Sequence, residues 1–260
     1  MFNKSKYNWF SRRTKLLVMG SFCLLGALIG AWLGHPQTSQ DETINLRSVM
    51  VTKRDLPLFH TVAMSRTDSS KHAVEVTIRA GDRQSVAIVS DYGGQEAVRT
   101  SVLDGVLHVV LNQKTGSEGT LRINLASPRL RKISMDGAGI IRINGGLRAA
   151  TIHLEASSGA HITAHRLGTR QLNVAVRRGG RIDVGGTTSL LRAQASSGTI
   201  HAGTLETDVA HVSSVERSQV EIRARQRLEA FGRRQGQILL QGDSQRVLRD
   251  LDTSSSLKLL

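Results

Sequence analysis

The C-terminal half of the chain repeats one short hydrophobic pattern. In each copy a run of small residues precedes an aliphatic residue, and alternating apolar and polar positions follow. The aliphatic anchors lie 21, 20, 18, 20 and 18 residues apart. They are Ile141, Ile162, Ile182, Ile200, Val220 and Ile238. A repeat of this length predicts a solenoid in which each copy forms one coil.

The alternation between the anchors predicts strands. Leu172, Val174 and Val176 recur at every second position, and no window shows the 3.6-residue period of a helix. At roughly 3.3 Å per residue, one copy fits two or three short strands with tight corners. We therefore predict an all-β parallel β-helix, or β-solenoid, of about five to six coils over residues 132–249, with the anchors stacked inside.

A leucine-rich repeat is the competing interpretation. Leu130, Ile133 and Met135 fit the opening of such a repeat loosely. The asparagine that should follow is missing, and no copy contains a helical half. The pattern therefore favours the β-solenoid.

Longer alternating runs precede the repeats. Residues 73–78, 85–89, 106–111 and 120–125 read as strands, and Asp104-Gly105 is a typical hairpin turn between two of them. We predict that residues 48–131 form an antiparallel β cap over the first coil, which protects its edge. Residues 250–260 form a tail that adds a last strand or frays.

The N-terminus predicts a membrane segment. Residues 1–15 carry five cations and no acid, and residues 16–34 carry no charge over a length that spans a bilayer as a helix. The charge bias places residues 1–15 in the cytoplasm. We predict a single-pass inner-membrane protein with a polar linker at 35–47 and its C-terminal domain in the periplasm. The alternative is signal cleavage after Ala31, which gives a secreted or periplasmic protein.

Two parts of the chain resemble a known family. They are the segment RDLPLF at residues 54–59, followed by AGDRQSV at 80–86, and the repeated small-residue runs such as DGAG at 136–139. This pattern is similar to the auto-transporter adhesin, head GIN domain family, a domain of unknown function. The resemblance covers about residues 48–220. It implies an exported β-helical domain and no catalytic residues. The chain departs from the family in its arginine-rich second half.

The charge pattern gives one candidate site. The chain has a net charge of +14, and without the five cations of residues 1–15 the remainder keeps 30 basic against 21 acidic residues. Arg223, Arg225 and Arg227 alternate, so on a strand they would share one face. Guanidinium groups form paired hydrogen bonds with phosphate and carboxylate groups. These three arginines are therefore a candidate polyanion-binding site, with a solvated face that binds no ligand as the alternative.

The sequence does not predict a catalytic, cofactor-binding or metal site. Asp136, Glu155, Asp183 and Glu206 occur about once per coil at different offsets, so register does not pair them as a glycosidase requires. His161 and His165 lack a further ligand at metal-binding spacing. The single cysteine, Cys23, excludes a disulfide scaffold.

These features predict the function only by class. We expect a non-catalytic, adhesin-like binding or structural module of the bacterial envelope, whose partners are the membrane and an envelope polymer or protein. A polysaccharide-acting lyase or hydrolase is the alternative. Aromatic residues make up 3% of the chain, which disfavours nucleic acid because single-stranded nucleic acids stack on aromatic side chains. The sequence does not determine the oligomeric state.

Overall fold

The computed structural model describes residues 41–46, 49–66, 73–79, 81, 83–90, 98–111 and 120–260. All of its regular elements are strands, and within these residues no helix has the length and apolarity needed to cross a bilayer. The predicted cytoplasmic segment 1–15 and membrane helix 16–34 lie outside the described residues.

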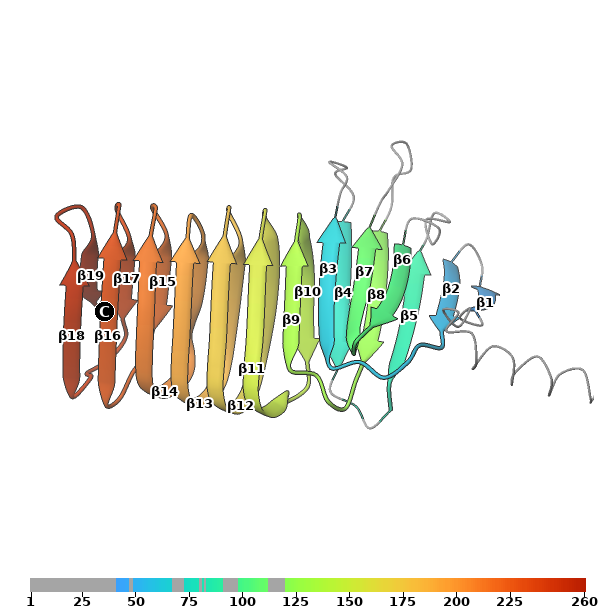
Figure 1. Ribbon diagram of the computed structural model, residues 1–260, viewed down its shortest axis with the longest axis horizontal. Coiled ribbons are helices and arrows are strands. Elements are labelled where there is room, and N and C mark those ends of the chain that lie inside the picture. Colours follow the sequence, from blue (N-terminus) through green and yellow to red (C-terminus); the bar gives the residue numbers. More distant parts are fainter. Residues whose placement is uncertain are drawn as a thin grey trace, which may run out of the picture. The chain divides into compact units, whose positions relative to one another are not determined.

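The strands form two rows, one behind the other (Figure 1). Each coil has one strand in each row, and the strands of successive coils pair in parallel. The first row contains β3 (Thr61–Arg66), β6 (Val98–Leu103), β7 (Val106–Leu111), β9 (Lys132–Asp136), β11 (Arg148–Ser157), β16 (Arg227–Arg233) and β18 (Arg246–Leu251). The second row contains β1 (Asp41–Leu46), β2 (Val49–Arg54), β4 (Ala73–Arg79), β5 (Ser85–Ser90), β8 (Thr120–Ala126), β10 (Gly139–Asn144), β15 (Gln219–Ile222), β17 (Gln237–Leu240) and β19 (Ser256–Leu259).

Three long strands belong to both rows. They are β12 (Ala160–Arg177), β13 (Arg181–Ser196) and β14 (Thr199–Val215). Each starts in the second row, bends, and ends in the first row, and the bend coincides with a register shift such as the one between Ala164 and Leu167. The repeats therefore form a two-row β-solenoid of about six turns, in agreement with the predicted fold class.

The predicted ladder of anchors forms the interior of the second row. Ile141, Ile162, Ile182, Ile200, Val220 and Ile238 pair with one another in register, and each is fully buried. The ladder continues to Val76 on one side and to Leu257 on the other. A parallel ladder in the first row runs through Leu154, Val174 and Ala193. The core is aliphatic, as predicted, and among the described residues Phe59 is its one aromatic side chain.

The N-terminal region only partly matches the predicted antiparallel cap. β1–β2, β2–β5, β5–β8 and β6–β7 are antiparallel, but β3–β7 and β4–β8 are parallel and extend the solenoid. The coil of β3 and β4 also lies between the β7–β8 coil and the β9–β10 coil, because β3 pairs with both β7 and β9. The alternation of residues 48–131 identified strands but gave no information about their partners.

One predicted boundary changes: residues 41–46, assigned to the linker, form β1, because Thr43 to Leu46 continue an alternating pattern that pairs with β2. Residues 250–260, predicted to add a last strand or to fray, contain the end of β18 and all of β19, so the first of the two alternatives holds. The leucine-rich alternative is excluded for the repeats, since residues 120–260 contain no helix.

The RDLPLF segment has a structural role. The Gln84 side chain accepts a hydrogen bond from the Phe59 N–H at 2.9 Å and donates to the carbonyls of Leu56 and Pro57. The Ser127 hydroxyl donates to the Phe59 carbonyl at 3.0 Å. Phe59 itself is buried, so the segment holds the chain in place directly before β3.

The last coil carries a protected edge. Among the described residues, β18 and β19 pair on one side only, with β16 and β17. Arg249 in the edge strand β18 is exposed and charged. Natural sheets often place charged side chains on an edge strand, because they prevent the edge from pairing with another chain.

Candidate functional site

The three candidate arginines lie at a corner of the solenoid rather than on one strand. β15 ends at Ile222, so Arg223 and Arg225 lie in the connection to β16, and Arg227 begins β16. Ala224 between them is buried, while Arg223 and Arg225 are exposed and Arg227 is half-buried. The three arginines therefore do not share one face of a strand, as the alternation predicted, but follow one another around a corner. We call Arg223, Arg225, Arg227 and their neighbour Arg246 the arginine corner.

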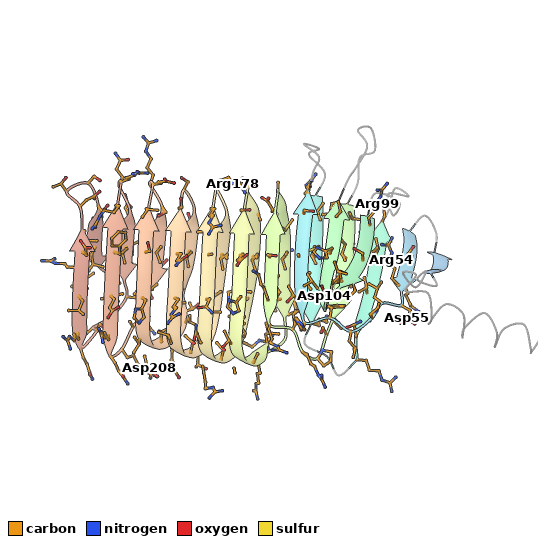
Figure 2. The ribbon with its side chains drawn as sticks, in the orientation of Figure 1. Arg54, Asp55, Arg99, Asp104, Arg178 and Asp208 are labelled. Atoms are coloured by element: carbon orange, nitrogen blue, oxygen red, sulfur yellow. The ribbon has the colours of Figure 1, made fainter. Side chains whose placement is uncertain are left out.

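The arginines of the corner differ in their availability to a ligand. Arg225 contacts Asp208 at 3.0 Å and Glu206 at 3.9 Å, and Figure 2 shows Asp208 at the lower edge of the strands. Arg227 forms an ion pair with Glu229. Among the described residues no carboxylate lies within ion-pair distance of Arg223. Arg223 is therefore the most accessible cation of the three.

Sequence analysis missed Arg246. It pairs in register with Arg227, is exposed, and forms no ion pair with a described residue. Its backbone N–H donates to the Gln226 carbonyl at 3.0 Å, which fixes it to the corner. Arg246 lies about one repeat after Arg227. The period of the anchors therefore already predicts that the two arginines are neighbours on adjacent coils.

Two cations at the opposite edge of the strands are paired with carboxylates: Arg178, at the upper edge in Figure 2, contacts Asp136 at 3.6 Å, and Arg234 contacts Glu216 at 3.1 Å. Arg217 at the same edge donates to the Gln235 side chain at 3.0 Å and forms no ion pair with a described residue. The hydroxyl of Ser196 lowers the pKa of Glu216, and the Ser255 hydroxyl together with the Arg234 backbone N–H lowers the pKa of Asp252 to about 2. These carboxylates stay ionised at neutral pH and pair with the chain itself.

The carboxylates considered for an enzyme do not converge. Glu155 binds Lys132 at 2.9 Å, Asp136 accepts a hydrogen bond from Ser157, and Glu206 lies at the arginine corner. Asp183 lies in the other row: burial opposes its ionisation, but hydrogen bonds from Arg181 and His161 outweigh burial and lower its pKa. Each carboxylate thus has its own cationic or hydroxyl partner, and none of these contacts joins two of them.

The histidines in the repeats pair with carboxylates. His161 contacts Asp183 at 2.6 Å, His201 contacts Glu221 at 2.9 Å, and His211 contacts Glu229 at 2.6 Å. His165 is exposed at the bend of β12 and does not join His161 in a common site. In the part of the chain that the structure describes, no three histidine, cysteine or acidic side chains are placed to hold a metal ion.

The geometry defines a class of protein. It is a β-solenoid with a largely aliphatic interior, and the charged side chains described lie on the outer surface and at the corners. The chain belongs to the family described as putative auto-transporter adhesin, head GIN domain, whose model matches residues 69–244. This confirms the resemblance found in the sequence, although the match begins after the RDLPLF segment and extends further toward the C-terminus. None of the curated proteins matches the chain.

Several solved structures share the fold. A putative adhesin from Bacteroides fragilis NCTC 9343 has a TM-score of 0.73 at 18% identity, over 83% of this chain and 98% of its own. A putative adhesin from Parabacteroides merdae ATCC 43184 has a TM-score of 0.62 at 12% identity, over 82% and 97%. A putative lipid binding protein from Parabacteroides distasonis ATCC 8503 has a TM-score of 0.62 at 15% identity, over the same shares. At these identities the likeness concerns the fold alone.

Proposed function

We propose that this protein is a non-catalytic, adhesin-like module of the bacterial envelope that contacts anionic polymers or lipid headgroups through the arginine corner. The single observation that carries the proposal is the exposed position of Arg223 at the corner, where no described carboxylate neutralises it. Arg225 lies in the same β15–β16 connection, and Arg246 extends this surface to the next coil.

The rest of the chain supports an envelope location. The family is described as an adhesin, and one protein with the same fold is described as a putative lipid binding protein. The basic residues 1–15 and the uncharged residues 16–34 have the pattern of a signal anchor. In our proposal this anchor holds the solenoid on the periplasmic side of the inner membrane.

The corner acts by charge and hydrogen-bond geometry. Arginine presents a planar fork of donors that matches phosphate and carboxylate oxygens, and each cation near an anionic surface contributes about 1 kcal/mol. Glu206 and Asp208 hold the Arg225 side chain in place but reduce the net positive charge of the corner. We therefore expect Arg223 to contribute most to binding and Arg227, which is paired with Glu229, to contribute least.

The proposal is tested by replacing Arg223, Arg225 and Arg227 together with glutamine. In low salt, residues 41–260 should bind vesicles of phosphatidylglycerol and phosphatidylcholine, and the triple variant should bind them roughly a hundredfold more weakly. The free energy of unfolding should change little, because exposed ion pairs contribute only about 0–1 kcal/mol. Vesicle co-sedimentation measures the first quantity and urea unfolding the second.

A matched control comes from the other end of the solenoid. Arg122 and Arg142 both pair with Glu75, and Arg99 is exposed, so this trio resembles the corner trio in charge and pairing. Replacing these three with glutamine should leave the affinity for vesicles within about twofold of the wild-type value, because charges outside a binding surface contribute little. An equal loss of binding in both triple variants would mean that net charge, and not the corner, attracts the vesicles.

A further inference from the structure

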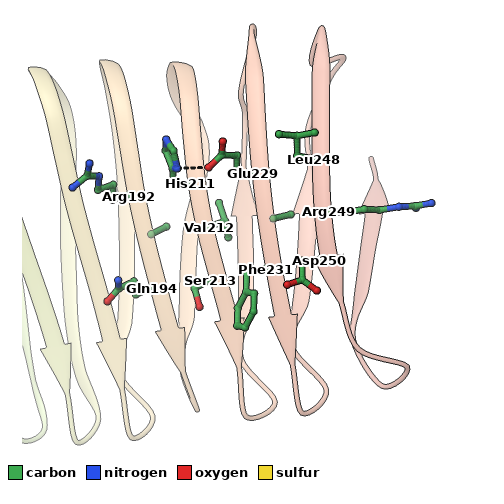
Figure 3. Close-up of a pocket in the computed structure, with 12 residues that line it drawn as sticks. Arg192, Gln194, His211, Val212, Ser213, Glu229, Phe231, Leu248, Arg249 and Asp250 are labelled. Carbon is green, nitrogen blue, oxygen red and sulfur yellow. Dashed lines mark ion pairs between the residues drawn. The ribbon is translucent and has the colours of Figure 1, made fainter.

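A groove of about 410 Å³ lies on the outer surface of the first row and reaches close to the C-terminal ends of its strands (Figure 3). It crosses β13, β14, β16 and β18. One line of side chains along it consists of residues paired in register: Gln194, Ser213, Phe231 and Asp250. The short Ser213 side chain stands between two larger ones, which deepens the surface next to the Phe231 ring.

Phe231 is an unusual residue for this surface. It is 38% exposed, and the only other aromatic side chain among the described residues, Phe59, is buried in the core. The Phe231 ring has a fixed position, because the Arg233 guanidinium lies 4.1 Å from its centroid. Arg233 is in turn held by the Asp250 carboxylate at 2.8 Å. The chain thus presents one oriented aromatic ring to solvent.

The charges around the ring are balanced. Arg233 pairs with Asp250, and on the neighbouring line of side chains Glu229 contacts His211, as the dashed line in Figure 3 marks. The two groove arginines that form no ion pair with a described residue are Arg192 and Arg249. Arg192 lies on β13, two strands from Phe231, and Figure 3 shows the Arg249 side chain directed away from the groove, so no unpaired cation lies beside the ring. Polyanions are not favoured here, and a long apolar chain would leave these polar groups without partners.

The remaining polar groups match a hydroxyl-rich ligand. Gln194 supplies an amide with donors and an acceptor, Ser213 a hydroxyl, and Arg192 a guanidinium that forms no ion pair with a described residue. Binding sites combine an apolar surface with a few polar groups that fix orientation. A pyranose ring has both parts, since its C–H face is apolar and its rim carries hydroxyls.

We propose that this groove binds a neutral oligosaccharide, with one pyranose ring stacked on Phe231 and hydroxyls of the neighbouring sugar units bonded to Ser213, Gln194 and Arg192. Glu229 lines this groove and also pairs with Arg227 of the arginine corner, but the proposal does not depend on polyanion binding by the corner. Neighbouring strands lie about 4.7–4.9 Å apart, so a sugar chain that runs across the strands meets a polar side chain on each of them.

The test is calorimetric titration of the full chain in detergent with neutral hexasaccharides of β-1,4-glucose, α-1,4-glucose, β-1,4-N-acetylglucosamine and α-mannose. At least one should bind saturably, with an affinity that does not change between low and physiological salt. Phe231→Ala should weaken this binding by about tenfold or more, while Phe231→Trp keeps it. The matched control is Leu190→Ala, an outward apolar residue of β13 outside the groove.

Several results would overturn the proposal. They are the absence of binding by all four sugars, unchanged binding by Phe231→Ala, and an equal loss in Leu190→Ala. Displacement of the sugar by a fatty acid would also reject it in favour of a lipid site. The variant Arg223→Gln removes a corner cation and leaves the Arg227–Glu229 ion pair beside the groove intact, so it should bind the sugar normally. A failure of the sugar site is therefore distinct from a failure of the proposed polyanion function.

Discussion

Replacing Ile182 with Asp is expected to lower the free energy of unfolding by about 3–5 kcal/mol. Ile182 is fully buried in the interior ladder, between Ile162 and Ile200. A carboxylate there has only aliphatic neighbours in the ladder, and an uncompensated buried charge is among the most destabilising changes in a protein. Urea unfolding of residues 41–260 measures the loss as a shift of the midpoint.

The control substitution must be made at a position whose side chain faces outward and does not contact a charged residue. His161 and Arg181 do face outward, as the alternation predicts, but both contact Asp183, so an aspartate at either position would add repulsion. Gln237 is the better control, because it is exposed and directly precedes the ladder residue Ile238. Gln237→Asp should cost about 0.5 kcal/mol or less. Equal losses for Ile182→Asp and Gln237→Asp would mean that the register of the solenoid is wrong.

Replacing Gly186 with Ala should cost about 3 kcal/mol or more. Gly186 has a φ of +125° at the bend of β13, a conformation that residues with a Cβ rarely adopt. A Cβ at this position would also collide with the backbone of Leu167 in the preceding coil, which pairs with Gly186 in register. The backbone cannot move away without breaking that pairing.

Gly242 separates the two causes of this loss. It has a φ of +74°, but nothing lies within 4 Å of the position of an added Cβ. Gly242→Ala should therefore show only the torsional cost, about 1–2 kcal/mol. Circular dichroism during urea unfolding compares the two variants. If Gly186→Ala were no more destabilising than Gly242→Ala, the close contact between the coils at the bend would not exist.

The sequence predicted the interior of the repeats well because each coil encodes it locally. Every anchor from Ile141 to Ile238 occurs at the same point of its copy, and a parallel ladder needs only that the copies have similar lengths. The order of the first coils was not predictable in the same way. Val62 pairs with both Leu107 and Ile133, and local alternation identifies strands without naming such distant partners.

The candidate surfaces show a similar limit. The spacing of Arg223, Arg225 and Arg227 indicated a common face, but the end of β15 at Ile222 turned that face into a corner. The line of Gln194, Ser213, Phe231 and Asp250 draws one residue from each coil, so no motif in a single copy contains it. Both Arg246 and this line of side chains can be found in the sequence by comparing residues that lie one repeat apart.

The central claim is that the arginine corner is the surface that meets an anionic polymer or lipid. The most direct measurement attaches an environment-sensitive fluorophore to residues 41–260, which contain no native cysteine. One variant carries the label at Gln226→Cys in the corner, and the other at Ser101→Cys, an exposed residue of β6. We expect phosphatidylglycerol vesicles in low salt to shift the emission of the corner label alone, with reversal at about 0.15 M salt. Equal shifts at both positions, or a shift at Ser101→Cys alone, would contradict the account.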